Sequence, residues 1–418
     1  MPDGDPHGAS ALRFADRFGG VAAVAFLTYI GEYMSFIVVL AFIINKLVLL
    51  FHMGGEAYLL VGAVSALYLV LSGLVAIPVG HLSDRYGKRR FAMLGCLLGA
   101  FSLFSLVIID RMTDPTQFFA GIAVSLCALG VAHGTYTATT LAYTGDVAEA
   151  SAMGKPYSLV EDAEFVGYAF GPALGAVVSV ALGRIITFTT SGLLMLVAAA
   201  MAFFFMRRSG APGGEPHAAS WSDFASAFRN SIVALILVTT FFSSLSFSGF
   251  FYYVPLYASA LRGTIPVLGV IYPVLQSLVA GTAVVLMFPF GHLTDRTGRR
   301  MPYLVSGLLI GALALASVFL APSLGGFVLA SVVFGLSLAL ARVNQLVILA
   351  EASTPSNRAG VMGTNHAMEH AGYGAGALVG GIITALLGGF VNTFRYLSIM
   401  LVVVGLIFLA VALVKKIR

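Results

Sequence analysis

The stretch Gly80-His-Leu-Ser-Asp-Arg-Tyr-Gly-Lys-Arg-Arg90 places four basic residues and one aspartate between two long apolar runs. A closely similar stretch, Gly291-His-Leu-Thr-Asp-Arg-Thr-Gly-Arg-Arg300, again separates two apolar runs later in the chain. A single basic segment of this kind is commonly a solvated turn that sets orientation in a membrane. Two copies in the same register indicate that the chain contains two versions of one unit.

The composition of the 418-residue chain is typical of a membrane protein. Hydrophobic residues make up 59% of it and charged residues 10%, whereas soluble proteins carry about 25% charged residues. The net charge of +5 lies mostly in connecting segments, which favours contact with lipid headgroups and argues against a nucleic-acid partner. Cys96 and Cys127 both lie in apolar runs, so we expect buried thiols and no disulfide framework.

The apolar runs predict an all-α membrane protein with twelve transmembrane helices. A helix rises about 1.5 Å per residue, so roughly 20 residues cross the hydrocarbon core of a bilayer. Runs of sufficient length fall at 19–45, 58–79, 91–110, 117–144, 158–181, 185–207, 229–257, 266–290, 302–320, 325–350, 359–387 and 391–414.

A polar segment rich in glycine and proline separates the first six runs from the last six. It predicts an N-terminal six-helix bundle over residues 1–207, a cytoplasmic linker over 208–228 and a C-terminal six-helix bundle over 229–418. The predicted side that holds the basic repeats and both termini carries 17 Lys and Arg residues, against five on the other side. By the positive-inside rule, both termini are cytoplasmic in a multi-pass protein of the plasma membrane.

The two halves align beyond the basic stretches. A shift of 205 residues places Asp146 on Glu351, where the fourth and tenth runs end. The same shift places Glu164 on Glu369. It also superimposes four further positions of the fifth and eleventh runs, namely Gly167, Tyr168, Gly171 and Gly175 on Gly372, Tyr373, Gly376 and Gly380.

Two six-helix halves with this basic stretch after the second and eighth runs resemble the major facilitator superfamily of secondary transporters, over essentially the whole chain. In that family the loop forms a cytoplasmic latch between the halves. The resemblance implies that Asp84 caps the start of the eleventh run, where a helix favours an anion, and that the basic residues reach Asp146. The residues implied in the latch are Gly80, Asp84, Arg85, Gly87, Lys88, Arg89, Asp146, Asp295, Arg296 and Glu351.

The fifth run, 158–181, carries Gly167-Tyr-Ala-Phe-Gly-Pro-Ala-Leu-Gly175. This string resembles a motif of proton-coupled exporters of the same superfamily. Small residues such as Gly171 let another helix approach closely, and Pro172 predicts a kink; ordinary close packing is the alternative. Such exporters usually carry an arginine in the fourth run, where this chain has Leu126. Arg342, in the tenth run, is a candidate to replace it from the other half.

Glu32 is the one carboxylate that the length of its run alone places at the bilayer midplane. It lies about 20 Å along the first helix, near the bilayer midplane and next to Tyr33. A charge in hydrocarbon costs at least about 2.5–3.5 kcal/mol, so such groups normally face a cavity and have a function. Loss of hydration disfavours the ionised form of a carboxylate, so Glu32 can bind and release a proton. A structural pairing with a hydroxyl or amide is the alternative.

Further polar side chains lie on the inner parts of the fourth, fifth, tenth and eleventh runs. For the residues at the start of the fifth and eleventh runs, the alternative is a first helical turn that reaches cytoplasmic water. We expect the whole set to line a proton-coupling or substrate cavity with Glu32 and Tyr33: His133, Glu164, Arg342, Asn344, His366, Glu369 and His370.

His366-Ala-Met-Glu-His370 also matches a string of one group of zinc peptidases. A zinc enzyme needs a third ligand and an activated water, and the match lies in a glycine-rich apolar run, so chance explains it best. Transient binding of a transported metal ion stays open. No phosphate-binding Gly-x-x-x-x-Gly-Lys string is present, so neither ATP drive nor any other cofactor is expected.

Together these patterns favour a secondary transporter, not an enzyme, that works by alternating access as a monomer. The resemblance favours a proton-coupled exporter, an antiporter, of small amphipathic or cationic compounds. Carboxylates outnumber deep cations, which disfavours a strongly anionic substrate, although Arg342 keeps a proton symporter for an organic acid open. A symporter for a sugar or metal complex, a transport-incompetent sensor and an intramembrane peptidase are the remaining alternatives.

Overall fold

In the computed structural model, the described residues, 6–147, 154–206, 228–261, 268–353 and 358–414, fold into long helices. The first half contains α1 (Pro6–Asn45), the short π-helix η1 (Lys46–Leu50), α2 (Glu56–Tyr86), α3 (Lys88–Ile109), α4 (Pro115–Val147), α5 (Gly154–Leu182) and α6 (Arg184–Phe205). The second contains α8 (Ser231–Ala260), α9 (Leu268–Thr297), α10 (Met301–Leu320), α11 (Leu324–Glu351), α12 (Arg358–Leu386) and α13 (Gly389–Val414).

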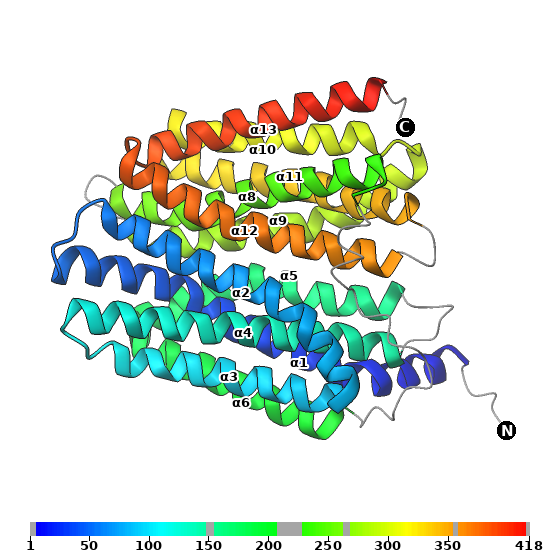
Figure 1. The fold of residues 1–418 in the computed structure, drawn as a ribbon, viewed down its shortest axis with the longest axis horizontal. Coiled ribbons are helices and arrows are strands. Elements are labelled where there is room, and N and C mark those ends of the chain that lie inside the picture. The colour runs from blue at the N-terminus through cyan, green and yellow to red at the C-terminus, as the bar shows by residue number, and fades with distance from the viewer. Residues whose placement is uncertain (1–5, 148–153, 207–227, 262–267, 354–357, 415–418) are drawn as a thin grey trace.

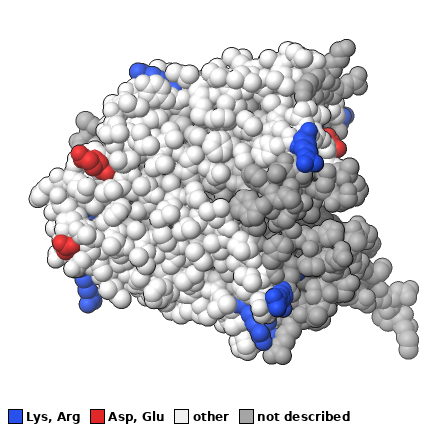
Figure 2. Space-filling view, in the orientation of Figure 1, with Lys and Arg blue, Asp and Glu red and all other residues white. Residues whose placement is uncertain are grey.

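The predicted all-α membrane fold is confirmed. Eleven of the described helices contain segments long and apolar enough to cross a membrane. The long helix outside this set is α12, because glycines and the polar side chains of Asn365, His366, Glu369 and His370 lower its hydropathy. Figure 2 shows the described charged side chains near the two ends of the molecule, with an uncharged flank between them on this face.

The helices are arranged as two bundles lying side by side (Figure 1). Within each half, α1 packs on α5 and α6, and α8 packs on α12 and α13. Between the halves, α2 packs along α12 and α5 packs along α9. α1 begins and α13 ends at the same end of the bundle (Figure 1), which is where α2 meets α3. Residues 208–227 of the expected linker lie outside the described residues, so the domain boundaries stay a prediction.

Glycines hold α5 against α1. A Cβ atom on Gly167 would meet Cβ of Tyr29 at 2.6 Å, and one on Gly171 would meet Cβ of Tyr33 at 2.7 Å. A Cβ on Gly175 would overlap the main-chain carbonyl oxygen of Met34. The glycine string is therefore a close-packing surface, as small residues spaced by four positions allow. Pro172 lies inside α5 and is buried.

The second half repeats this contact. Cβ atoms on Gly372 and Gly376 of α12 would overlap the carbonyl oxygens of Phe241 and Leu245 on α8. The α12–α8 contact thus matches the α5–α1 contact, with helices that the 205-residue shift superimposes. The helix contacts of the two halves therefore repeat in the same way as the two halves of the sequence.

Glycines also bring the two halves together along α2 and α12. A Cβ on Gly62 would lie 2.6 Å from the carbonyl oxygen of Ala377, and one on Gly73 would lie 2.9 Å from Cβ of His370. At the end opposite the basic stretches, a Cβ on Gly55 would lie 3.2 Å from the carbonyl oxygen of Ala385. The halves are therefore in close contact from that end to about the middle of the bundle.

The basic stretches form tight turns at one end of the bundle. Gly87 joins α2 to α3 with φ of +102°, a backbone conformation that side-chain-bearing residues rarely adopt. Arg89 lies over the ring of Phe203, 4.3 Å from its centroid. In the second half, Arg300 forms an ion pair of 3.5 Å with Glu351, which joins the end of α11 to the start of α10.

The latch as a whole stays a prediction. The side chains of Asp84, Asp146 and Asp295 lie outside the described residues. Of the remaining members, Lys88 is buried, while Arg85 and Arg296 are exposed.

Gly175→Ala should lower the free energy of unfolding by roughly 1–3 kcal/mol, because its new methyl group has no room beside Met34. Gly281→Ala is the matched control, since Gly281 lies in α9 with no atom within 4 Å of an added Cβ. That control should be neutral or slightly stabilising, by up to about 1 kcal/mol, because alanine favours a helix over glycine. Thermal unfolding of both variants in detergent measures the difference; equal effects would contradict the close α1–α5 packing.

Candidate functional site

Glu32 lies at the centre of the first half and is fully buried. Its carboxylate accepts hydrogen bonds from the phenol groups of Tyr68 on α2 and Tyr136 on α4. Nδ1 of His133, also on α4, lies 2.9 Å from Glu32 Oε2. Two hydroxyl donors and one imidazole nitrogen from two other helices thus surround this carboxylate, which offsets much of the cost of burying a charge.

His133 connects this cluster with its surroundings. The histidine is 3% exposed, and its Nδ1 lies 3.0 Å from Tyr136 Oη and 3.4 Å from Tyr68 Oη. Tyr29 packs edge-on against Tyr136, with ring centroids 5.7 Å apart. We call Glu32, Tyr68, His133 and Tyr136 the Glu32 cluster. It can hold a proton on either the carboxylate or the imidazole, because the two groups are in direct contact.

A second polar cluster lies in the other half. The guanidinium of Arg342 on α11 donates to Glu369 on α12, and Tyr373 Oη donates to the same Glu369 oxygen at 2.5 Å. The Glu369 side chain is 5% exposed and that of Arg342 is 20% exposed. We call Arg342, Glu369 and Tyr373 the Arg342 cluster. Because its charges are paired, it can be buried between helices.

Histidines bridge the two clusters across the interface between the halves. The ring centroids of His133 on α4 and His370 on α12 are 5.8 Å apart, and those of His366 and His370 are 4.4 Å apart. Nδ1 of His370 is buried and has no hydrogen-bond partner among the described residues. The imidazoles therefore form a short series from the Glu32 cluster toward the Arg342 cluster.

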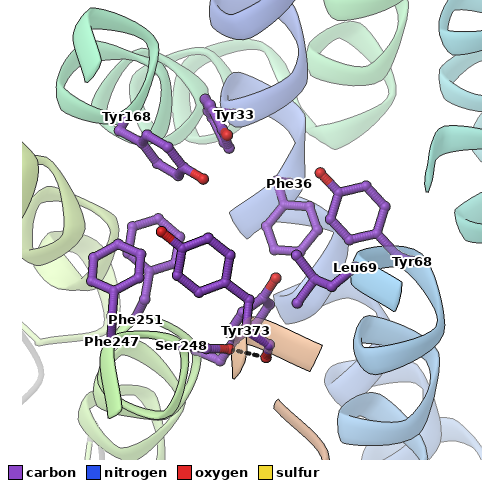
Figure 3. A pocket seen from close by; sticks show the side chains of 10 residues that line it. Tyr33, Phe36, Tyr68, Leu69, Tyr168, Phe247, Ser248, Phe251 and Tyr373 are labelled. Carbon is purple, nitrogen blue, oxygen red and sulfur yellow. Dashed lines mark hydrogen bonds between the residues drawn. The ribbon is translucent and has the colours of Figure 1, made fainter. Parts of the chain in front are cut away.

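Two cavities lie along this interface. The aromatic cavity contains side chains of α1, α2, α5, α8 and α12 (Figure 3). It is lined by Tyr33, Phe36, Tyr68, Leu69, Tyr168, Phe247, Ser248, Phe251, Tyr252 and Tyr373. The polar cavity is lined by Tyr29, Thr137, Leu141, Val160, Glu164, Arg342, His366, Glu369, His370 and Tyr373. Tyr373 lines both, so the two spaces adjoin at its ring.

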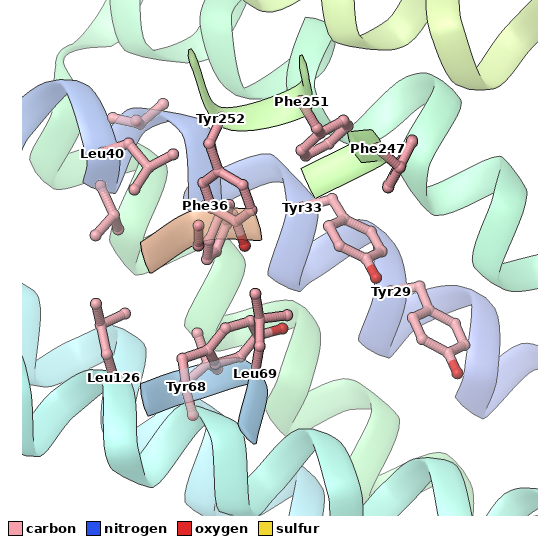
Figure 4. Packing of buried hydrophobic residues seen from close by; sticks show 14 of the residues in the cluster. Tyr29, Tyr33, Phe36, Leu40, Tyr68, Leu69, Leu126, Phe247, Phe251 and Tyr252 are labelled. Atoms are coloured by element: carbon pink, nitrogen blue, oxygen red, sulfur yellow. The ribbon is translucent and has the colours of Figure 1, made fainter. Parts of the chain in front are cut away.

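Aromatic rings from both halves meet in the aromatic cavity. Tyr33 and Tyr168 stack with centroids 3.8 Å apart, and Tyr168 packs edge-on against Phe251 at 5.7 Å. Figure 4 shows Tyr29, Tyr33 and Phe36 projecting from successive turns of α1, with Phe247, Phe251 and Tyr252 of α8 nearby. Phe36 and Tyr252 meet edge-on at 5.3 Å. This space suits an apolar or aromatic group.

The structure brings together most of the residues that we predicted for the central cavity. Glu164, Arg342, His366, Glu369 and His370 line the polar cavity, although they come from three helices. Tyr33 lines the aromatic cavity, and Glu32 and His133 form the neighbouring cluster. The structure establishes where these residues lie. Their roles in proton coupling or substrate binding stay predictions.

Asn344 is not among the residues that line the two central cavities, and its role stays a prediction. It is fully buried, and its amide donates to the carbonyl oxygen of Leu340 one turn earlier in α11. Asn344 follows Arg342 by two positions, which is slightly more than half a helical turn, so the two side chains leave α11 in different directions. Gln345 instead lines a pocket within the second half, together with Arg342.

Sequence reasoning missed the tyrosines that hold the carboxylates. Tyr68 lies in an otherwise apolar stretch of α2, and nothing in the local sequence marks it as a partner of Glu32. Tyr136 follows His133 by three residues and so shares its helix face, a signal that could have been used. Tyr373 follows Glu369 by four residues and carried the same signal.

The string His366-Ala-Met-Glu-His370 has no metal-site geometry. Its Glu369 is engaged by Arg342 and Tyr373. Within the part of the chain that the structure describes, no group of three His, Cys, Asp or Glu side chains could hold a metal ion.

The sequence has Leu126 where the exporter pattern has an arginine, and the structure shows the surroundings of this position. Leu126 is buried in the apolar core of the first half. Arg342, which the 205-residue shift superimposes on Thr137, lies on the opposite half, and both residues line the polar cavity. The polar cavity thus contains an arginine from α11; whether it replaces the arginine expected in the fourth run stays a prediction.

Eleven described helices of membrane-spanning length, arranged in two bundles with polar and aromatic cavities between them, indicate a multi-pass membrane protein. The family model of the Major Facilitator Superfamily matches residues 21–284 and 273–417, so the chain belongs to this superfamily. Its transporters bind small-molecule substrates, and the family indicates a transport protein, not an enzyme.

Particular relatives are more distant. The chain is 31% identical over 97 residues to the nitrite extrusion protein of Bacillus subtilis, covering 22% of this chain and 24% of that protein. It is 27% identical over 243 residues to the hippocampus abundant transcript 1 protein of Mus musculus, covering 54% and 47%. The matches thus span about a quarter and about half of these relatives.

A solved structure reproduces the fold over nearly the whole chain. The POT family transporter PepTSo superimposes with a TM-score of 0.73 at 14% identity, covering 96% of this chain and 98% of that one. At this identity the likeness shows the fold alone.

Tyr136→Phe should lower the free energy of unfolding by about 1–3 kcal/mol, because the buried Glu32 carboxylate loses one hydrogen-bond donor. Tyr396→Phe, which changes a tyrosine that is 46% exposed on α13, is the matched control and should stay within about 0.5 kcal/mol. Chemical or thermal unfolding of purified protein measures both. A Tyr136 variant as stable as the control would show that this donor does not hold Glu32.

Proposed function

We propose that this protein is a proton-coupled secondary transporter in which the Glu32 cluster binds the coupling proton. The observation that carries the proposal is the fully buried contact between Glu32 and His133, beside the interface of the two halves. A proton can drive transport only if it binds more tightly in one facing state than in the other. Motion of α12 relative to α4 would change the environment of His133 through His370, which gives the cluster such a difference.

The substrate that fits the cavities is a small amphipathic compound. The aromatic cavity offers rings for an apolar body, and the adjoining polar cavity offers charged groups for a polar end. We further propose that the protein acts as a monomer in the plasma membrane, with both termini cytoplasmic, in line with the distribution of basic residues. The Gly167–Gly175 string, which packs α5 on α1, supports export in exchange for protons through its resemblance to exporter sequences.

The structure favours a second candidate, proton symport of a small organic acid. The argument for a cationic substrate depended on the excess of carboxylates, but two of them have donors within the protein. Glu32 has three polar contacts and Glu369 has two. Arg342 lines the polar cavity and could bind an anionic group.

Glu32→Gln should reduce proton-driven accumulation of substrate by at least about tenfold, because glutamine imitates the protonated carboxyl but cannot release a proton. Substrate exchange without a proton gradient should persist. The measurement is flux of candidate compounds in proteoliposomes under an imposed pH gradient, applied in both directions to determine export or import.

Glu56→Gln, at the exposed start of α2, is the matched control and should accumulate substrate as the unmodified protein does. If Glu32→Gln still drives uphill transport with unchanged pH dependence, the coupling proton binds elsewhere. Glu164 would then be the next carboxylate to replace.

A further inference from the structure

The Arg342 cluster is a carboxylate site that a side chain of the protein occupies. Glu369 Oε1 accepts from the Arg342 guanidinium and from Tyr373 Oη, so two donors on different helices converge on one carboxylate oxygen. An arginine and a phenol form charge-assisted hydrogen bonds with a carboxylate and favour it over a neutral group. A second carboxylate could use the same donors if Glu369 moved away.

The cluster lies where three cavities meet. Tyr373 lines the aromatic cavity, the polar cavity and the pocket within the second half, and Arg342 lines the last two. A ligand carboxylate placed on Arg342 and Tyr373 would therefore have its body beside the Tyr373 ring. Around that ring, the aromatic cavity supplies Phe247, 5.5 Å away between centroids, and the stacked pair Tyr33 and Tyr168. Flat rings pack well against such surfaces.

The charged side chains that line the polar cavity are Arg342, Glu164 and Glu369, so an anionic ligand needs the donors that Glu369 now uses. Among the described residues that line the two central cavities, Arg342 is the one Lys or Arg side chain. Glu32 is fully buried behind its three polar partners and lines neither cavity. A cationic ligand would have to compete with Arg342 for Glu369, whereas an anionic ligand competes with Glu369 for Arg342 and Tyr373.

We propose that the substrate is a small aromatic carboxylate, which replaces Glu369 on Arg342 and Tyr373, and that the displaced Glu369 takes up one proton. This inference rests on the second candidate function proposed above, proton symport of a small organic acid. The proton comes from the acid form of the buffer in the surrounding solution, which is left as its conjugate base while one O–H bond forms on Glu369. The ligand carboxylate stays ionised, so the site gains one negative charge and one positive charge.

Protonation of the displaced Glu369 follows from its surroundings. Away from Arg342 it would be a buried carboxylate without a cation, in a cavity that also contains Glu164, and an unpaired buried charge is costly. α8 contains no charged residue, and Arg395 of α13 lies near Asn392 and Phe319. The two central cavities are lined by these titratable or charged side chains besides Glu369: Tyr29 and Tyr33 of α1, Tyr68 of α2, Glu164 and Tyr168 of α5, Tyr252 of α8, Arg342 of α11, and His366, His370 and Tyr373 of α12. His133 of α4 lies next to His370.

Binding of benzoate to the purified protein in lipid nanodiscs tests the proposal, with benzamide and benzylamine as neutral and cationic isosteres. Isothermal titration calorimetry in two buffers of different ionisation enthalpy gives both affinity and proton uptake. We expect benzoate to bind at least about tenfold more tightly than either isostere, with uptake of up to about one proton. Its affinity should rise as the pH falls from about 8 to 6, because binding and protonation of Glu369 support each other.

Glu369→Gln removes the internal competitor. This variant should bind benzoate at least as tightly as the unmodified protein at pH 8, without proton uptake and without pH dependence. Arg342→Gln should weaken benzoate binding by at least about tenfold, because it removes the charged donor. Arg395→Gln is the matched arginine control and should leave binding unchanged.

Glu369→Gln leaves Arg342 without its carboxylate partner and could fold poorly. Benzoate should then raise its unfolding temperature more than that of the unmodified protein. The double variant R342Q/E369Q has no buried charge at this site; it should fold but show no benzoate effect.

Three results would overturn the proposal: no binding of benzoate, phenylacetate or hexanoate to the unmodified protein; tighter binding of benzylamine than of benzoate; or equal loss of benzoate binding in Glu369→Gln and Arg342→Gln. The outcome is separable from that of the proposed proton site. If Glu32→Gln loses gradient-driven flux but the protein has no Arg342-dependent anion site, the proposed proton site at Glu32 is supported and the proposed substrate site is refuted. If benzoate binding depends on Arg342 but Glu32→Gln still couples transport to protons, only the proposed proton site at Glu32 is refuted.

Discussion

The cost of placing a charge in the interior of a membrane governs the centre of this protein. An ionised side chain there needs donors or an opposite charge, and these must come from other helices. Glu32 of α1 obtains them from α2 and α4, and Glu369 of α12 obtains one from α11. The charged groups therefore join helices as well as providing chemistry. Any motion that separates those helices changes the stability of the charge, which is the physical basis for coupling ions to movement.

Close packing makes two pairs of helices rigid, namely α1 with α5 and α8 with α12. Glycines bring α5 onto α1 and α12 onto α8 so closely that main-chain oxygens occupy the space of a side chain. Each of these helix pairs should move as one body, because a close-packed interface does not deform gradually. The space between the pairs is filled by aromatic rings, for example Tyr168 against Phe247 and Phe251. Contacts between rings can be exchanged for contacts with a ligand, whereas the glycine contacts cannot.

The duplicated scaffold carries two different polar sites. In the first half the carboxylate of Glu32 is surrounded by hydroxyl groups and a histidine, and it is sealed from the cavities. In the second half the carboxylate of Glu369 is paired with arginine beside open space. We infer that the Glu32 site binds the coupling proton, whereas the site beside the cavities binds the substrate and takes up a proton on Glu369 when the substrate displaces it. Histidines 133 and 370 lie between them, at the surface where the halves meet.

The sequence by itself determined the helical membrane fold and the duplication, and it predicted a buried carboxylate at Glu32, because hydropathy and helix length are local properties that a bilayer enforces on every span. It also predicted that Glu164 and Glu369 share a cavity, since repeated halves place equivalent residues opposite each other. Only the tertiary structure decided the partners. Tyr68 meets Glu32, Arg342 meets Glu369, and Asn344 turns away from the cavity, because the rotation of each helix about its axis is set by packing with neighbours far apart in the chain.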